Sequence, residues 1–124
     1  MTEKERFIEK LKIRTRKFSV DVIKFCESLE KSHASSVITY QIVKAATSIG
    51  ANYRAACRAR SQPEFYSKLC IVVEEADETE YWLEIIQESE LTCDEAKLLE
   101  LRTEASELTR ILAKAKKSTY TSIK

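Results

Sequence analysis

The side chains that could carry out acid–base or metal chemistry are few and widely spaced. The chain has 124 residues and a single histidine, His33, in a segment predicted to be a loop, without an obvious aspartate or serine partner. The sequence contains no G-x-S-x-G, no H-E-x-x-H and no glycine-rich phosphate loop. The four cysteines never form a C-x-x-C pair, so we expect small buried hydrophobic side chains in a reducing cytosol: Cys26, Cys57, Cys70 and Cys93.

Two carboxylates, Glu75 and Glu78, lie among apolar positions of a predicted helix, where a di-iron site would place its ligands. Di-iron bundles use Glu-x-x-His pairs, and a chain with one histidine cannot supply two of them. We expect both carboxylates to accept hydrogen bonds or salt bridges near a helix contact. The sequence therefore predicts no enzyme, no cofactor and no metal site.

The basic residues carry the strongest functional signal. Arginine suits bidentate phosphate recognition and stacking on bases, so a set of basic residues at helical spacing is a candidate nucleic-acid surface: Arg14, Lys17, Arg54, Arg58 and Arg60. Arg14 and Lys17 belong to a longer basic stripe, which Asp21 interrupts. The alternative is that this stripe is solvated, or pairs with an acidic stripe of another helix or subunit: Glu74, Asp77, Glu84 and Glu88.

The charges are segregated along the chain. The net charge is only +1, so no field of the whole chain attracts polyanions. Residues 1–68 carry 14 basic and 7 acidic groups, whereas residues 69–107 carry 2 basic and 13 acidic groups. The last 17 residues, 108–124, carry 5 basic groups and no acidic one. A single chain becomes a good RNA binder only if assembly repeats its basic face.

Composition and periodicity predict an all-α fold. One glycine and one proline in the whole chain disfavour sandwiches, Rossmann folds and P-loop enzymes, which need glycine turns. Apolar residues recur in steps of three and four, predicting one domain over residues 1–124, with helices near 3–30, 36–60, 63–89 and 93–117 and a frayed tail at 118–124. Short connections between long helices favour an antiparallel up-down-up-down four-helix bundle with left-handed packing.

The second and third predicted helices each carry two adjacent apolar stripes. The second stripe of helix 36–60 contains Gly50 and Tyr53, and that of helix 63–89 contains Trp82. A helix of an isolated bundle buries one arc of its surface, so a second apolar stripe suggests a contact between subunits. The alternative is a wide arc buried within one chain. Asn52, inside an apolar stripe of helix 36–60, is expected to fix register.

Residues 45–83 closely resemble the bacterial four-helix bundle family first noticed as proteins encoded by intervening sequences within 23S rRNA genes. The resemblance rests on A-x-S-I-x-A-N ending at Asn52, a basic stretch, S-x-x-E-F beginning at Ser61, and E-x-x-E-T-x-Y-W-L ending at Leu83. Two positions depart from the family pattern. Gly50 stands where many members have proline, and Ala55 stands where many have glutamate.

The resemblance implies a small bundle that assembles into a ring-like homopentamer without enzyme activity. Relatives include the accessory proteins of diversity-generating retroelements, whose basic pentamers work with a reverse transcriptase and its RNA. The positions that match the motif are implied to lie at helix and subunit contacts: Ser48, Asn52, Arg58, Ser61, Glu64, Phe65, Glu75, Glu78 and Leu83. With the stripe residues Gly50, Tyr53 and Trp82, Asn52, Glu75 and Glu78 are the candidate oligomer contacts.

We therefore hypothesise a homo-oligomeric adaptor that binds structured RNA or an RNA-bound partner such as a reverse transcriptase. The alternative is a protein–protein scaffold that binds no nucleic acid. The sequence contains no run of about 18 apolar residues, so we expect no membrane span. The first residues lack the apolar core of a signal peptide, so we expect a cytoplasmic protein.

Overall fold

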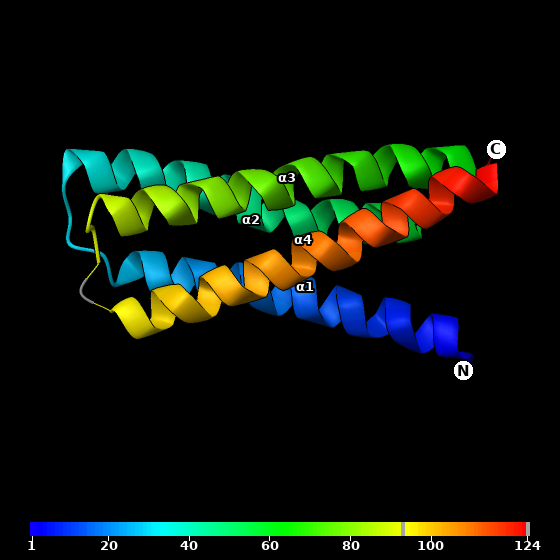
Figure 1. Ribbon diagram of the computed structural model, residues 1–124, viewed down its shortest axis with the longest axis horizontal. Coiled ribbons are helices and arrows are strands. Elements are labelled where there is room, and N and C mark those ends of the chain that lie inside the picture. Colours follow the sequence, from blue (N-terminus) through cyan, green and yellow to red (C-terminus); the bar gives the residue numbers. More distant parts are fainter. Residues whose placement is uncertain (93, 124) are drawn as a thin grey trace.

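The computed structural model describes residues 1–92 and 94–123, and within them the backbone forms four long helices. These are α1 (Glu3–Glu27), α2 (His33–Cys57), α3 (Gln62–Glu88) and α4 (Glu95–Ile123). Successive helices run in opposite directions, and the chain termini lie at the same end of the molecule (Figure 1). The predicted antiparallel up-down-up-down bundle of the all-α class is confirmed.

Side-chain caps determine where the helices begin. Thr2 and Glu5 form a reciprocal capping box at α1, and Ser32 and Ser35 form one at α2. The Ser61 hydroxyl accepts a hydrogen bond from the backbone N–H of Glu64 at α3, as expected for its N-cap. Among the described residues the backbone N–H of Ser61 donates no return bond to the Glu64 carboxylate, so this serine and glutamate form only half of a capping box.

The helix boundaries differ from the predicted ones at several ends. α2 begins at His33 rather than near 36, because Ser35 serves as the N3 residue of the Ser32 cap instead of breaking the helix. α1 and α2 each end three residues earlier than predicted, and α3 is shifted by one residue. The predicted start of the last helix at Cys93 lies outside the described residues.

The predicted frayed tail is helical as far as Ile123. In this last part of α4, the hydroxyls of Thr119, Thr121 and Ser122 each donate to the carbonyl four residues earlier. The ring of Tyr120 also packs against that of Tyr66 on α3, with ring centres 5.4 Å apart. Contacts to α3 thus keep a polar segment helical where composition predicted fraying.

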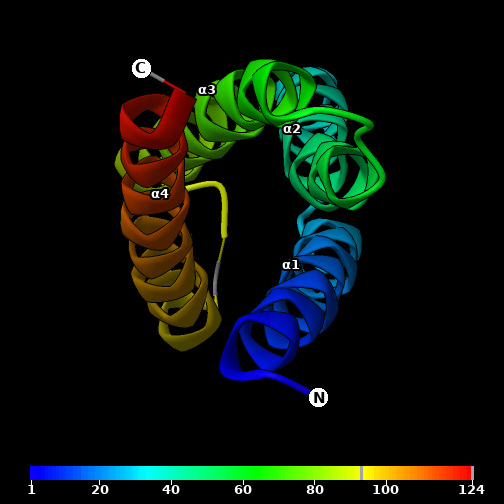
Figure 2. The ribbon, with the colours of Figure 1, turned by 90° about the vertical axis from the view of Figure 1, so that its right-hand side faces the viewer.

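The core lies between the helices and takes residues from all four. α2 packs against α1 and α3, while α4 packs against α3 and, less extensively, α1, so that the helices form an arc seen end-on (Figure 2). Thr15 and Thr79 are buried, and their hydroxyls donate to carbonyls of their own helices. No buried side-chain polar atom of the described residues lacks a partner, which is what a stable core requires.

Glu90 closes α3 in a left-handed conformation, with φ of 55°. The backbone N–H of Leu91 donates to the carbonyl of Ile86, the bond that marks a Schellman motif. Glycine is the usual residue at this position because a Cβ is strained there. The chain instead has its one glycine, Gly50, inside α2.

Glu90→Gly is expected to raise the free energy of unfolding by about 1 kcal/mol, because it relieves the strain of a left-handed residue. Urea denaturation followed by circular dichroism measures the change. Glu74→Gly, the same substitution at an exposed position inside α3, is the control and should lower the unfolding free energy by about 1 kcal/mol. A loss of stability in both variants would contradict the assignment.

Candidate nucleic-acid interface

A close approach of α1 and α2 builds a groove on the outside of the bundle. A Cβ built on Gly50 would lie 3.5 Å from the backbone carbonyl of Thr15, so the two helices meet with little side-chain material between them. One turn away, the hydroxyl of Ser19 donates across the interface to the carbonyl of Ala46 over 3.0 Å. Small residues and one interhelical hydrogen bond therefore form the floor of the groove.

Cationic side chains surround this groove, which has a volume of about 480 Å³. Arg16 comes from α1, Arg54 comes from the last turn of α2, and Arg58 is the C-cap residue that follows it. All three side chains are exposed, and no acidic side chain of the described residues forms an ion pair with them. The one carboxylate in the lining, Glu9, lies 3.3 Å from the ammonium of Lys12. Within the described part of the chain, the groove thus holds three guanidinium groups free to bind an anion.

Arg14 lies elsewhere, between α1 and α4. Its guanidinium donates to both carboxylate oxygens of Glu104, over 2.7 and 2.8 Å, and lies 2.9 Å from the carboxylate of Glu107. The bonds to Glu104 hold the pKa of Arg14 above its usual value, although partial burial opposes them. Arg14 is therefore occupied by ion pairs within the chain. Its partners lie on α4 and are not members of the acidic stripe that the alternative interpretation named.

Lys17 and Arg60, two other predicted nucleic-acid residues, are also placed outside the groove lining. The ammonium of Lys17 lies 2.7 Å from the carboxylate of Asp21, which raises the pKa of Lys17. Arg60 is almost fully exposed, 3.9 Å from Glu64. Of the five predicted residues, Arg54 and Arg58 line the groove between α1 and α2. Arg14 and Lys17 line a separate hollow, beside carboxylates of α1 and α4.

Arg16 and Lys12 line the groove but were not among the predicted nucleic-acid residues, and of the two only Arg16 lacks an ion pair among the described residues. Arg16 lies one helical turn from Lys12 on α1, on the side that faces α2 rather than on the stripe containing Arg14. The spacing of Lys12 and Arg16 matches that of Arg54 and Arg58, and this shared four-residue step was the signal available in the sequence. Recognising it required knowledge of which faces of the two helices meet.

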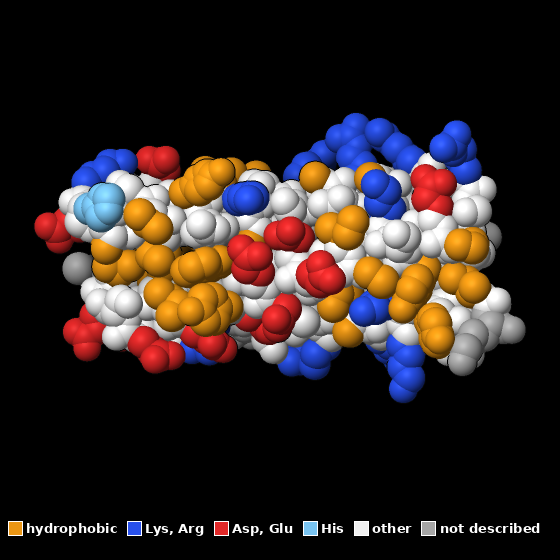
Figure 3. Space-filling model, turned by 90° about the horizontal axis from the view of Figure 1, so that it is seen from above, with side chains coloured by type: hydrophobic (Ala, Val, Ile, Leu, Met, Phe, Trp, Pro, Cys, Tyr) orange, Lys and Arg blue, Asp and Glu red, His pale blue; other side chains and the backbone are white. Residues whose placement is uncertain are grey.

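A second surface combines apolar and acidic side chains over α2 and α3. Lys44 of α2 lies over the Tyr40 ring and interacts electrostatically with Glu75 of α3. The indole N–H of Trp82 donates to the Glu78 carboxylate over 3.1 Å. Partial burial, and then the negative charge of Glu78, raise the pKa of Glu75. Figure 3 shows hydrophobic side chains gathered on both sides of a group of acidic ones on this face.

Three predicted contact residues of α2 lie inside or close to the chain's own packing. Tyr53 is only 2% exposed and belongs to the core. Gly50 faces Thr15 of α1, and Asn52, half-buried, donates its amide to the carbonyl of Ser48 on its own helix. Both apolar stripes of α2 are therefore largely used within the chain, whereas the second stripe of α3 remains partly exposed.

The described cysteines and carboxylates do not gather into a metal site. No group of three or more histidine, cysteine, aspartate or glutamate side chains among the described residues could hold a metal ion. Cys26 is buried, and burial raises the pKa of its thiol to about 11. In the described part of the chain, no helix has both the length and the apolar composition needed to cross a bilayer.

Comparison with known proteins gives one family. Residues 9–114 match the family described as 23S rRNA-intervening sequence protein. A crystal structure from Bacteroides thetaiotaomicron VPI-5482, described as a protein with unknown function from the S23 ribosomal protein family, is 33% identical, with a TM-score of 0.78. The similarity covers 86% of this chain and 98% of that one. No curated protein matches the sequence.

Arg14→Met should lower the free energy of unfolding by about 1 kcal/mol, because a bidentate, networked ion pair at a partly exposed site lies near the top of the range for surface pairs. Methionine keeps most of the apolar stem, so the destabilisation should shrink at high salt. Lys17→Met, which removes a pair within α1 alone, should leave the melting temperature nearly unchanged. Equal destabilisation of the two variants, measured by thermal and urea denaturation, would contradict a specific role for Arg14.

Proposed function

The chain belongs to the 23S rRNA-intervening sequence protein family, and from this premise we propose that it is a non-enzymatic, homo-oligomeric adaptor that binds structured RNA. The groove between α1 and α2 is the proposed contact with RNA. The observation that carries the proposal is the presence around one hollow of three guanidinium groups, from Arg16, Arg54 and Arg58, that no carboxylate of the described residues neutralises. An RNA already bound to a partner, such as a reverse transcriptase, is recognised through the same groove.

The groove suits a phosphate backbone better than a base edge. Its arginines approach from two helices, and its floor at Gly50 and Ala51 lets a chain of phosphates come close to the protein backbone. Guanidinium groups bind phosphate oxygens in pairs, which positions a nucleic acid without selecting its sequence. The proposed adaptor therefore recognises the shape of an RNA more than its sequence.

Replacing Arg16, Arg54 and Arg58 together by glutamate should weaken binding of a labelled RNA hairpin by at least about tenfold, because three attractive interactions with phosphates become repulsive. The slope of log affinity against log salt should also fall by roughly 0.7–0.9 for each phosphate that is no longer neutralised. Fluorescence anisotropy at several salt concentrations measures both quantities. Arg14 stays unchanged, so that the ion pair between α1 and α4 is preserved.

The matched control replaces three exposed lysines outside the groove by glutamate: Lys24, Lys31 and Lys117. It makes the same change in net charge and should retain most of the affinity. If both triple variants lose affinity equally, the groove is not the binding site and only total charge matters. If neither loses affinity, RNA binding does not depend on these arginines.

A protein–protein scaffold without nucleic acid is the second candidate, and the ion pairs of Arg14 with Glu104 and Glu107 favour it. In these pairs, acidic residues of the same chain neutralise part of the basic stripe. In this alternative, neighbouring subunits would neutralise the groove arginines too. RNA would then not be retained at physiological salt, and assembly would weaken as salt increases.

Assembly is proposed to use the face shared by α2 and α3. Tyr40 and Tyr81 are 61% and 51% exposed there, and large aromatic side chains are typical of the centres of protein interfaces. Trp82, half-buried beside Tyr81, and the partly buried Glu75 fit the rim of such a contact. The ring-like pentamer implied by the sequence resemblance would repeat the basic groove five times.

Light scattering after size-exclusion chromatography, with absorbance read at 260 and 280 nm, should give a mass near five times the 14.3 kDa of one chain. Tyr40→Glu combined with Tyr81→Glu should reduce that mass to a monomer, because two charges would be buried without partners. Leu99→Glu, at an apolar α4 residue that is 67% exposed, is the control and should leave the mass unchanged. A monomeric wild-type protein would rule out the proposed assembly.

A further inference from the structure

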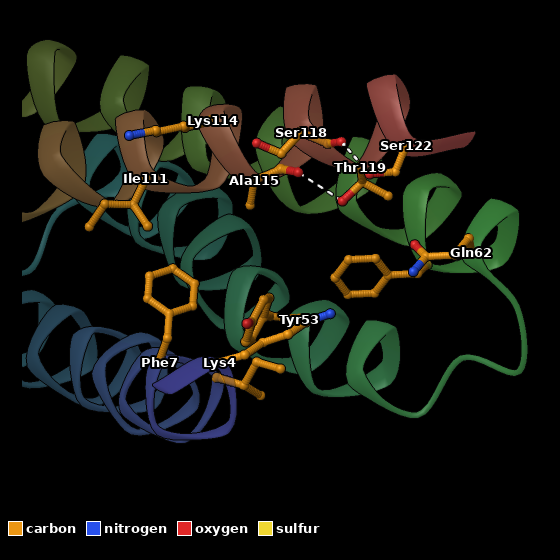
Figure 4. Close-up of a pocket in the computed structure, with 12 residues that line it drawn as sticks. Lys4, Phe7, Tyr53, Gln62, Ile111, Lys114, Ala115, Ser118, Thr119 and Ser122 are labelled. Atoms are coloured by element: carbon orange, nitrogen blue, oxygen red, sulfur yellow. Dashed lines mark hydrogen bonds between the residues drawn. The ribbon is translucent and has the colours of Figure 1, made fainter. Parts of the chain in front are cut away.

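An apolar cavity of about 530 Å³ lies at the end of the bundle where α1 begins and α4 ends (Figure 4). These two helices diverge toward the chain termini, as Figure 1 shows. The ion pairs of Arg14 with Glu104 and Glu107 join the middles of the same helices. Beyond this connection the gap between α1 and α4 is not filled by side chains, and the cavity results.

The walls of the cavity are largely aromatic and aliphatic. Phe7 points from α1 toward Ile111 of α4, and Tyr53 forms the base from α2. Phe65 of α3 lies on the remaining side. Phe7 is 49% exposed although it faces other apolar groups, so the wall has apolar area that water now covers. A cavity of this size and lining is typical of small-molecule sites, which range over roughly 300–1,000 Å³.

The polar groups of the lining favour an anion. Lys4 of α1 and Lys114 of α4 are its two charged residues, and no carboxylate is among the described residues that line it. The remaining polar groups are neutral: Gln62, Ser118, Thr119 and Ser122. The hydroxyls of Thr119 and Ser122 already donate to carbonyls of α4, so these two groups offer an anion no free hydrogen. The lysines therefore determine the charge that the cavity accepts.

We propose that this cavity binds an amphipathic monocarboxylate. The apolar chain of the ligand covers Phe7, Tyr53 and Phe65, and its carboxylate lies at the rim near Lys4 and Lys114. Apolar burial supplies most of the affinity and the lysines supply the preference for an acid. This site shares no lining residue with the groove between α1 and α2, so it does not depend on RNA binding.

Isothermal titration calorimetry of the full chain with decanoate, below its micelle-forming concentration, tests the proposal. We expect one saturable site per chain, with decyltrimethylammonium binding at least about tenfold more weakly because its head group is a cation. Lys4→Glu combined with Lys114→Glu should weaken decanoate binding by roughly tenfold. The control, Lys10→Glu combined with Lys117→Glu outside the lining, should retain it. Equal binding of the acid and the cation would overturn the proposed preference.

Filling the cavity gives a second, independent test. Ala115→Trp should abolish decanoate binding, whereas Ala113→Trp, on an exposed side of the same helix, should leave it intact. In the wild-type protein, nuclear Overhauser effects should connect the decanoate chain to the rings of Phe7 and Tyr53, and this measurement needs no variant to fold. Unsaturable binding, or the absence of these signals, would overturn the proposal. Unchanged decanoate binding with a lower solution mass for Ala115→Trp would also overturn it and identify a contact between copies.

Discussion

The ion pairs that Arg14 makes with Glu104 and Glu107 connect the first helix of the bundle to the last. Among the described residues, these pairs join the basic first half of the chain to the acidic stretch 69–107. They also mark where the contact between α1 and α4 ends. Toward the chain termini the two helices diverge and leave the apolar cavity. An interaction that stabilises the fold thus removes Arg14 from the surface available to a polyanion.

Helical periodicity predicted the four helices, because apolar spacing depends on residues close together in sequence. The Ser61 cap is equally local, since its hydroxyl binds the backbone N–H of Glu64 three residues later. Helix ends were harder, since they depend on competing local bonds and on distant contacts. Ser35 extends α2 by completing a capping box, and Tyr120 packs against Tyr66 near the end of α4. The capping box could be read from four adjacent residues, but the contact between the two tyrosines joins positions far apart in the chain.

The candidate site was predictable only in part, for a related physical reason. Spacing shows that Arg54 and Arg58 share a face of one helix, and the structure places them at one groove. Spacing along the sequence does not show which face of the neighbouring helix lies opposite. For this reason Arg14 was selected and Arg16 was missed. Likewise, the sequence did not show whether the second apolar stripe of α2 packs within the chain or against another subunit. Burial of Tyr53 shows that much of it faces the chain's own core, while the corresponding stripe of α3 stays partly exposed.

The proposed functions of the groove and of the α2–α3 face depend on each other. A chain with net charge +1 and three groove arginines would make about three phosphate contacts, and its salt dependence would be correspondingly shallow. Copies joined through α2 and α3 would present several grooves to one RNA, and each additional engaged groove would bind as an intramolecular step. The affinity would then rise steeply with the number of copies, although no groove changes. Assembly is therefore the step that would convert a weak, general phosphate site into an RNA-binding surface.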